Sequence, residues 1–299
     1  MMSINFELYK VFYYVASNLS FSGAAGNMYI SQSAVSQAIK QLEEQLGSKL
    51  FSRNTKQVRL TRSGELLFRH VEQAFNFLKT GERSIAELHA LQQGELKIGA
   101  SDTICKYFLL PYLKQFHQLY PKVKINITNR PSPVCAELLI KGLVDVSIIH
   151  LPGNAPRKDM KVRRLQTIHD VFIAGTKYGY LQHQPLEIGQ LTAYPLLMLE
   201  PNSTTRLFFD QYLQQHNLKI SPEIELDSVD IMIELVKIGL GISFVPREYI
   251  QKELAGDELI LLNVNAQIPS RYLGVVTHAS LPVPDAAKKF MELLVSCQS

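Results

Sequence analysis

The sequence predicts a protein of mixed α+β and α/β class, with a small helical domain, a long linking helix and a larger α/β domain. Three observations lead to this prediction. Apolar residues recur at helical spacing up to residue 46, a helical pattern of about 30 residues follows residue 61, and strands alternate with helices from residue 95 onwards. At 299 residues the chain is long enough for two or three domains, each with its own core.

A helix is expected to begin at residue 32, because Val35, Ile39 and Leu42 form an apolar stripe and Ser31 is placed to cap its first turn. The opposite face carries short polar side chains in place of the Glu and Lys pairs of an ordinary solvated face. Side chains of this kind suit hydrogen bonds to base edges in a DNA major groove. They are Gln32, Ser33, Ser36, Gln37 and Lys40.

The preceding segment predicts a helix of about two turns, since Phe21, Ala24, Ala25 and Met28 form a second apolar stripe. Another helix, over residues 5–17, would pack above both. Two helices joined by so short a break are typical of a helix-turn-helix, although an ordinary helical hairpin in a globular core has the same pattern. Gly26 in the shorter helix is expected to weaken it.

Residues 48–62 are basic and contain no acidic residue. Val58 and Leu60 alternate with polar residues like a strand, and Asn54 is placed where the chain could turn back on Leu50 and Phe51. A two-stranded basic wing of this kind suits contacts with DNA phosphates, whereas a solvated basic loop is the alternative. The predicted phosphate-binding residues are Lys49, Arg53, Lys56, Arg59 and Arg62.

The excess positive charge lies in this N-terminal part. Residues 1–62 contain seven Lys and Arg against three Asp and Glu, a net charge of +4, and the whole chain also has a net charge of +4. The remainder is therefore balanced, at 24 basic against 24 acidic residues. This distribution is typical of a nucleic-acid-binding segment joined to a neutral domain.

The motif SFSGAAGNMYISQSAVSQAIKQLEEQLGSKLFSRNTKQVRLTRSGE resembles the N-terminal winged helix-turn-helix of LysR-type transcriptional regulators over about 45 residues. The chain departs from the family pattern at Gly26 and Asn27, where a charged or long polar residue is usual. The matching positions are Phe21, Ala24, Ala25, Ser31, Gln32, Ser33, Val35, Ser36, Ile39, Leu42, Glu43, Leu46, Gly47, Leu50, Phe51, Arg53, Leu60, Thr61 and Gly64.

A long helix, capped by Thr61, is predicted to run to about residue 92. Its apolar residues follow a heptad, with Leu67, Ala74, Gly81 and Leu88 in one register and Val71, Leu78 and Ile85 in the other. A helix packed only on its own domain is the alternative, but so long a helix has little local core to cover. We therefore expect a dimerisation helix, which the resemblance also implies.

From residue 95 the pattern becomes strand, helix, strand, helix, strand, which predicts a parallel sheet with helices on its faces. The expected strands and helices, in order, are 95–99, 103–119, 122–129, 134–141, 144–150, 170–174, 195–199, 204–215, 224–226, 228–238, 242–245, 259–264, 272–277 and 285–295.

The resemblance implies that this α/β part forms two lobes, as in periplasmic binding proteins, with crossovers near residues 161–166 and 264–270. Family landmarks in this half include Gly142–Asp145 and Gly239–Pro246. The expected division is a DNA-binding domain over 1–61, a linker helix over 62–92 and an effector domain over 93–299. Lobe I would comprise about 93–163 and 268–299, and lobe II about 164–267.

Ligands of open α/β sheets bind beyond the carboxyl ends of strands, at helix N-termini. Three loops here have that position, and their hydroxyl and amide groups suit a small anion or polar metabolite. In the alternative interpretation these side chains only cap their helices. The candidate effector-binding residues are Ser101, Thr103, Asn129, Ser132, His150, Asn202, Ser203 and Thr204, and Asp102 would disfavour an anion if it faced the cleft.

The sequence contains no motif of a catalytic, metal-binding or cofactor-binding site. No metal-binding spacing, nucleophile elbow, phosphate loop or dinucleotide fingerprint is present, so neither a metal nor a cofactor is expected. No signal peptide or membrane span is recognisable, and three widely spaced cysteines favour a reducing cytoplasm. Cys105 begins a helix and could be a redox sensor, although an inert buried thiol is the simpler interpretation.

The sequence is thus interpreted as a non-enzymatic transcriptional regulator that binds an inverted repeat in promoter DNA as a homodimer or homotetramer. A small effector between the lobes would control it, and RNA polymerase is a further expected partner. A solute-binding protein with a helical extension and a cytosolic α/β enzyme are the alternatives, but neither explains the first 62 residues.

Overall fold

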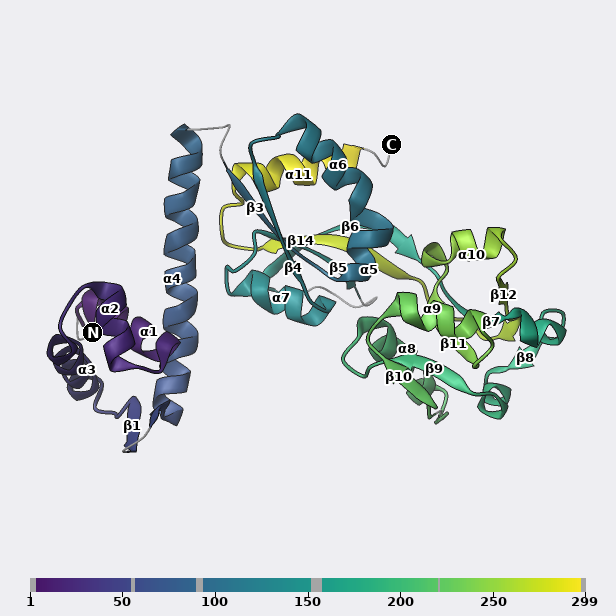
Figure 1. Ribbon diagram of the computed structural model, residues 1–299, viewed down its shortest axis with the longest axis horizontal. Helices are drawn as coiled ribbons and strands as arrows, with labels where there is room; N and C mark the ends of the chain where they lie inside the picture. Colours follow the sequence, from purple (N-terminus) through teal and green to yellow (C-terminus); the bar gives the residue numbers. More distant parts are fainter. Residues whose placement is uncertain (1–3, 55–56, 90–93, 152–157, 220, 297–299) are drawn as a thin grey trace. The chain divides into compact units, whose positions relative to one another are not determined.

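The computed structural model describes residues 4–54, 57–89, 94–151, 158–219 and 221–296. It divides into two compact units, residues 1–83 and 84–299. The N-terminal unit contains α1 Phe6–Asn18, α2 Phe21–Met28, α3 Gln32–Leu46, strands β1 Phe51–Asn54 and β2 Gln57–Leu60, and most of α4 Arg62–His89 (Figure 1).

Local sequence sets the helix ends of the N-terminal unit. The hydroxyl of Ser31 accepts from the backbone N–H of Ala34 and caps α3, as predicted, and Thr61 caps α4 in the same way by accepting from Gly64. The short helix α2 continues through Gly26 to Met28, and its end is closed by Tyr29 in the left-handed region. The predicted stripes of α2 and α3 and the buried face of α1 meet in one core.

Strands β1 and β2 form the predicted antiparallel wing, with Arg53 opposite Val58. A buried carboxylate joins the wing to α3, because Glu43 accepts from the backbone N–H groups of Leu50 and Phe51 and from the ammonium of Lys49. Burial alone would raise the pKa of Glu43, but these hydrogen bonds hold it below its usual value. The charge of Glu43 therefore stabilises the base of the wing.

The helix α4 uses its two halves differently. In the first half, Phe75 stacks against Tyr13 of α1 at a ring-centroid distance of 4.8 Å, and Val71 is buried in the same core. In the second half, the apolar side chain of Leu78 is 50% exposed and that of Ile85 is 60% exposed. The predicted heptad is thus covered locally at its start and uncovered towards its end.

The larger unit contains two five-stranded mixed sheets, one in each lobe. In lobe I the strand order is β4-β3-β5-β14-β6, with β14 antiparallel to both of its neighbours. Its elements are β3 Glu95–Ala100, α5 Asp102–Ile104, the π-helical turn η1 Cys105–Leu109, α6 Leu110–Leu119, β4 Lys124–Asn129, α7 Ser132–Ile140, β5 Val146–Leu151, β6 Met160–Ile168, β14 Arg271–His278 and α11 Asp285–Ser296.

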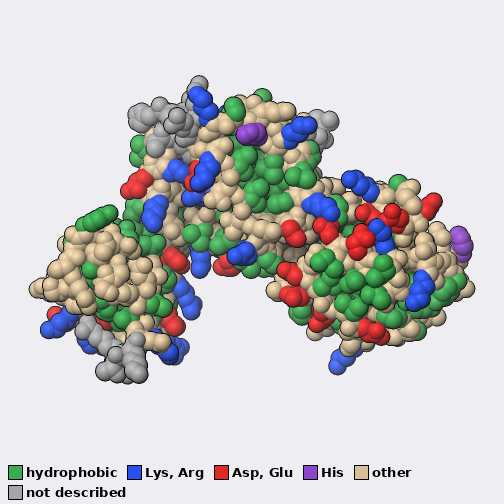
Figure 2. All heavy atoms as spheres, viewed as in Figure 1, with side chains coloured by type: hydrophobic (Ala, Val, Ile, Leu, Met, Phe, Trp, Pro, Cys, Tyr) green, Lys and Arg blue, Asp and Glu red, His purple; other side chains and the backbone are tan. Residues whose placement is uncertain are grey.

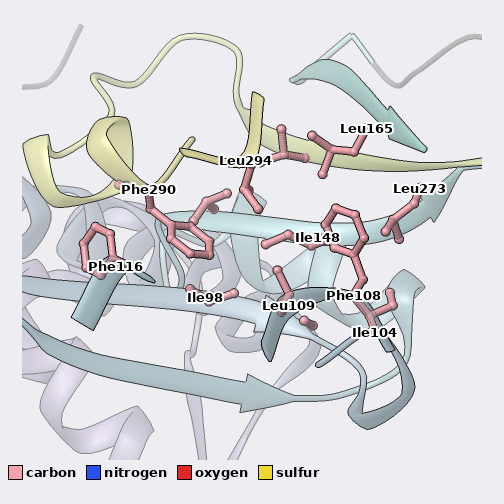
Figure 3. Packing of buried hydrophobic residues seen from close by; sticks show 14 of the residues in the cluster. Ile98, Ile104, Phe108, Leu109, Phe116, Ile148, Leu165, Leu273, Phe290 and Leu294 are labelled. Atoms are coloured by element: carbon pink, nitrogen blue, oxygen red, sulfur yellow. The ribbon is translucent and has the colours of Figure 1, made fainter. Parts of the chain in front are cut away.

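Helices cover both faces of the lobe I sheet (Figure 1). On one face α6 and α11 pack together, and the ring of Phe116 meets that of Phe290 edge-on at 5.4 Å above Ile98 of β3 (Figure 3). On the other face Cys135 and Leu139 of α7 are buried. The apolar runs of β3 and β5 follow from this arrangement, because both faces of these strands are covered.

Lobe II repeats this layered arrangement with strand order β10-β9-β11-β7-β12. Phe209 of α8 packs on one face of the sheet and Met232 of α9 on the other. The elements are β7 Asp170–Gly175, η2 Thr176–Leu181, β8 Leu186–Glu187, η3 Ile188–Ala193, β9 Leu196–Leu199, α8 Thr204–Gln215, β10 Ile224–Leu226, α9 Val229–Lys237, β11 Ile242–Pro246, η4 Arg247–Tyr249, α10 Gln251–Ala255, β12 Leu259–Leu261 and β13 Val264–Asn265.

Three features of lobe I differ from the sequence prediction. The sheet was expected to be parallel, but β14 makes it mixed. Residues 161–166, expected to form the first crossover, belong to strand β6, and the chain passes into β7 of lobe II at His169. The helix expected over 103–119 is interrupted by the π turn η1. The hydrophobic periodicity of the sequence did not predict β6. Few residues of this strand face inwards, and the charged residues Lys161, Arg163 and Arg164 dominate its sequence.

Candidate functional site

The outer face of α3 carries the predicted base-reading residues. Gln32, Ser33, Gln37 and Lys40 are exposed, and Ser36 is half-buried. Two of these side chains have neighbours of their own, since Ser33 lies 2.9 Å from the hydroxyl of Ser31 and Lys40 lies 3.7 Å from Glu44. Both contacts are exposed and weak, so these side chains can turn towards another molecule at small cost.

The predicted phosphate-binding residues differ in the partners that they already have within the protein. Arg59 and Arg62 are exposed at the wing and at the first residue of α4, and the guanidinium of Arg59 is held by Gln57 at 2.8 Å. Lys49 is exposed but pairs with buried Glu43 at 2.8 Å, so part of its charge is already engaged. Lys56 and the side chain of Arg53 lie outside the described residues.

A cavity of about 310 Å³ lies between lobe I and lobe II and collects most of the predicted effector-binding residues. The exception is Asn202, which is exposed in the turn before the helix cap Ser203 and does not line the cavity. The lining residues are Ser101, Asp102, Thr103, Asn129, Arg130, Pro131, Ser132, His150, Leu199, Ser203, Thr204, Thr205, Asp227, Val229 and Tyr249.

Four helices begin at the wall of this cavity, namely α5, α7, α8 and α9. The partial positive charge and free N–H groups of a helix N-terminus favour a negatively charged or oxygen-rich ligand. At the rim, Asp102 and Asp227 are exposed acids and Arg130 is an exposed base. Asp102 also accepts from the backbone N–H of Thr103, so its carboxylate is partly occupied by its own helix.

Four hydroxyls of the wall already accept a hydrogen bond from the protein. Ser101 and Ser203 accept from backbone N–H groups of the helices that they cap, and Ser132 accepts from the backbone N–H of His150. The hydroxyl of Thr205 accepts from the guanidinium of Arg271 at 3.2 Å. Each hydroxyl therefore keeps its own proton for a ligand oxygen, and Thr204 Oγ1 is buried with no protein partner in the described part of the chain.

His150 provides one further donor. Its Nε2 atom lies 2.7 Å from the hydroxyl of Tyr249, and burial together with the charge of Arg271 lowers its pKa to about 3. The imidazole is therefore neutral. In the tautomer in which the phenol donates to Nε2, the ring proton is on Nδ1, and this nitrogen is buried with no partner among the described residues.

Beneath the wall lies an ion pair that fixes the floor of the cavity. Arg271 and Asp170 are completely buried, and the guanidinium binds the carboxylate through two hydrogen bonds of 2.6 and 2.5 Å. Asp170 opens β7 of lobe II and Arg271 opens β14 of lobe I. The pair therefore joins the two strands that leave the crossovers, and through Thr205 it reaches the cavity.

Sequence reasoning missed Thr205, Tyr249 and Arg271. Thr205 is adjacent to a predicted residue on the same helix, so inspection of the whole first turn could have found it. Tyr249 contacts His150, which lies 99 residues away in the chain, and Arg271 contacts Asp170, which lies 101 residues away. No local sequence pattern predicts such contacts. The alternative interpretation of Cys105 as a redox sensor gains no support, because burial and the charge of Asp102 raise its thiol pKa to about 11.

Within the described residues, no cluster of potential ligands could hold a metal ion, and no helix is long and apolar enough to cross a membrane.

The family model of the LysR substrate binding domain matches residues 89–297. The model of the bacterial regulatory helix-turn-helix protein, lysR family, matches residues 6–65.

Individual relatives agree with the family models. A probable RuBisCO transcriptional regulator from Nostoc sp. is 30% identical, over 93% of this chain and 84% of its own. A full-length OxyR variant from Pseudomonas aeruginosa has the same fold, with a TM-score of 0.69 at 22% identity over 98% of this chain and 95% of that one.

The regulatory domain of CcmR from Synechocystis, solved in complex with 2-PG, has a TM-score of 0.62 at 22% identity. It covers 69% of this chain and 97% of its own. Similarity at this level shows the fold of the two-lobed unit. Since one family model spans more than half of the chain and the other spans its N-terminal unit, the protein belongs to the LysR family of transcriptional regulators, with a helix-turn-helix DNA-binding domain and an effector-binding domain.

Proposed function

We propose that this regulator reads an inverted repeat in promoter DNA with α3 and holds the flanking phosphates with the wing. The observation that carries the proposal is the outer face of α3, where exposed Ser33 and Gln37 can form hydrogen bonds with base edges. The wing adds Arg59 and Arg62 beside that face, and the sequence places Lys49, Arg53 and Lys56 in the same segment.

We infer that the regulator works as a dimer built on α4 and assembles further into a tetramer. The uncovered seam of Leu78 and Ile85 supports the dimer, because apolar residues at heptad spacing are stabilised by a second helix. Two recognition helices on one dimer match the two halves of an inverted repeat. Contact with RNA polymerase is the further step by which such an assembly would alter transcription.

We propose that the effector is a small oxyanion, such as a carboxylate or a phosphate ester, bound in the cavity between the lobes. The donors that support this are the protons of Ser132 and Thr205, the Nδ1–H group of His150 and the N-termini of α7, α8 and α9. The 2-PG bound by the structurally similar CcmR domain belongs to this chemical class.

We also propose that the cavity binds its effector without converting it. A nucleophilic hydroxyl needs a neighbouring base, and Ser132 instead accepts a hydrogen bond from the backbone of His150. The ring of His150 is a poor base at neutral pH, because its pKa is about 3 and its Nε2 atom is engaged by Tyr249.

The DNA proposal is tested by footprinting the full-length protein on the DNA upstream of its own gene, across a salt series. We expect a footprint with dyad symmetry and an affinity that falls steeply with salt, because each phosphate contact releases counterions. Binding no tighter than to random DNA of equal length would overturn the assignment of this promoter as the target.

The effector proposal is tested by calorimetric titration of the same protein with 2-PG, inorganic phosphate and an uncharged diol. We expect binding of at least one oxyanion and none of the diol. Thr205→Val keeps the side-chain shape but removes the hydroxyl, and it should weaken that binding by about tenfold. Equal affinity of Thr205→Val and the unchanged protein would exclude this hydroxyl as a ligand.

A further inference from the structure

Besides the buried pair of Arg271 and Asp170, a second carboxylate joins the two lobes next to the effector cavity. Asp230, in the first turn of α9 in lobe II, accepts through its Oδ1 atom from the ammonium of Lys106 at 2.8 Å and from the hydroxyl of Tyr107 at 2.6 Å. Both donors belong to η1 of lobe I. A single oxygen of lobe II is thus bound by two consecutive residues of lobe I.

The π turn explains how two consecutive residues reach the same atom. Its hydrogen bonds span one residue more than those of an α-helix, so successive side chains lie closer together around the helix axis. The ammonium of Lys106 lies 4.9 Å from the centre of the Tyr107 ring, which confirms that the two side chains run together towards Asp230. Short π turns inside helices are rare and are frequent at functional sites.

A second contact connects Tyr107, which binds Asp230, with the wall of the effector cavity. The ring of Tyr107 stacks on that of Tyr249 at a centroid distance of 4.7 Å and an interplanar angle of 20°. The hydroxyl of Tyr249 lies 2.7 Å from His150 Nε2, and both Tyr249 and His150 line the cavity. Direct contacts therefore lead from the cavity wall, through two aromatic rings, to Asp230.

The stack also has space on its far side. A second cavity, of about 290 Å³, is lined by Lys106, Tyr107 and Asp230 together with apolar residues of α9, including Ile231 and Leu235. Figure 2 shows acidic and basic side chains side by side over the face where α9 and α10 lie. Because Tyr107 is not enclosed on that side, its ring has room to separate from Tyr249 when the lobes move apart.

We propose that Lys106, Tyr107 and Asp230 form an inter-lobe latch, and that Tyr249 connects this latch to the occupant of the cavity. A ligand that binds His150 through Nδ1 changes the position of the ring that Tyr249 holds through Nε2. The stacked ring of Tyr107 follows, and the hydroxyl of Tyr107 closes on Asp230 or leaves it. The latch therefore converts occupancy of the cavity into the spacing of the two lobes.

Hydrogen–deuterium exchange on the full-length protein tests the latch without any ligand. Tyr107→Phe keeps the stacked ring but removes the bond to Asp230, and Asp230→Asn weakens both bonds. The matched control is Glu234→Gln, which alters an exposed acid one turn later on the same helix and leaves the latch intact. Two peptides report the effect: residues 101–112 in lobe I and residues 227–237 in lobe II.

The expected result is reciprocal. Tyr107→Phe should speed exchange in the lobe II peptide, and Asp230→Asn in the lobe I peptide, each by about three- to tenfold, the equivalent of one lost hydrogen bond. Combining the two changes should add little, because both remove the same contact. If each variant alters only its own peptide, or if Glu234→Gln gives the same cross-lobe effect, the latch does not exist.

Tyr249→Phe tests the connection to the cavity. This variant keeps the stack and loses the bond to His150, so both peptides should exchange faster, although neither contains the changed residue. Unchanged exchange in both would mean that the latch is independent of the cavity. The purpose of the latch depends on the proposed effector site, but these measurements contain no effector. A failed titration with 2-PG or phosphate is therefore distinguishable from a failed latch.

Discussion

The outer face of α3 and the wall of the effector cavity are built from the same kinds of side chain in opposite environments. On α3, Ser33 and Gln37 are exposed, and no buried backbone group depends on them. In the cavity, Ser132 and Thr205 are buried and each accepts a hydrogen bond from a buried donor. Side chains on the first surface can turn towards different bases, whereas those on the second are held in one orientation.

This difference has an energetic consequence. A change on α3 should alter binding and leave stability unchanged, because exposed polar groups exchange one water contact for another. A change at the cavity should alter both, since removal of one partner leaves a buried donor or charge without its hydrogen bond. Substitutions at the two surfaces test this separation between binding and stability.

Arg271→Met should lower the free energy of unfolding of the effector-binding unit by about 3–5 kcal/mol. The substitution leaves the carboxylate of Asp170 completely buried without its charge partner. Urea denaturation followed by circular dichroism measures the loss. The control is Lys288→Met, which removes a solvent-exposed pair with Asp285 and should cost less than about 1 kcal/mol. Equal losses in the two variants would contradict the structural role of the buried pair.

His150→Gln should make the stability of this unit less sensitive to acid. In the unfolded chain the histidine titrates near its ordinary pKa of 6.5, and in the folded protein near 3. As the pH falls below 6.5 only the unfolded state gains the proton, so the native protein loses about 1.4 kcal/mol per pH unit down to about pH 3.

Glutamine does not titrate, so His150→Gln should lack this loss. Between pH 7 and pH 4.5 the unchanged protein should lose about 2–3 kcal/mol more than the variant, as measured by urea denaturation at each pH. Parallel losses in both proteins would show that His150 is protonated in the folded state as readily as in the unfolded chain.

Gln37→Ala and Arg59→Ala should separate base reading from phosphate binding without changing stability. Loss of a base contact at Gln37 should weaken binding to the specific site by about 1–3 kcal/mol and leave non-specific binding unchanged. Arg59→Ala should weaken both kinds of binding and reduce the salt dependence by about one phosphate contact. Fluorescence anisotropy on specific and random duplexes distinguishes these results, and a large fall in melting temperature in either variant would contradict the comparison.

Gly26→Ala should produce the smallest effect, a gain of about 0.5–1 kcal/mol in the stability of the N-terminal unit. A Cβ atom added at Gly26 meets nothing within 4 Å, and the residue has helical geometry inside α2. Alanine therefore removes only the excess flexibility of glycine. Thermal denaturation of the full-length protein measures the gain, and no change would mean that α2 is already rigid at this position.

The parts of the fold that sequence reasoning could predict are those encoded in neighbouring residues. The caps at Ser31 and Thr61, the wing and the helix Thr204–Gln215 all follow from patterns a few residues long. The return of residues 268–299 to lobe I was expected only from the family resemblance. Periodicity alone could predict neither that return nor the antiparallel direction of β14, because pairing with β5 joins segments about 120 residues apart. The same limit applies to the cavity, whose hydroxyls were predictable as helix caps, while Tyr249 and Arg271 were not.

The π turn at Cys105–Leu109 gives the helical segment between Asp102 and Leu119 one residue more than a regular α-helix of the same length would need. A π turn is equivalent to one extra residue inserted into an α-helix, so deletion of one residue between 105 and 109 would restore a regular helix. Every side chain before the deletion, including that of Ile104 in the lobe I core, would then rotate by about 100° relative to α6. A deletion after Tyr107 would therefore turn Lys106 and Tyr107 away from their present direction, and the contact with Asp230 would be lost.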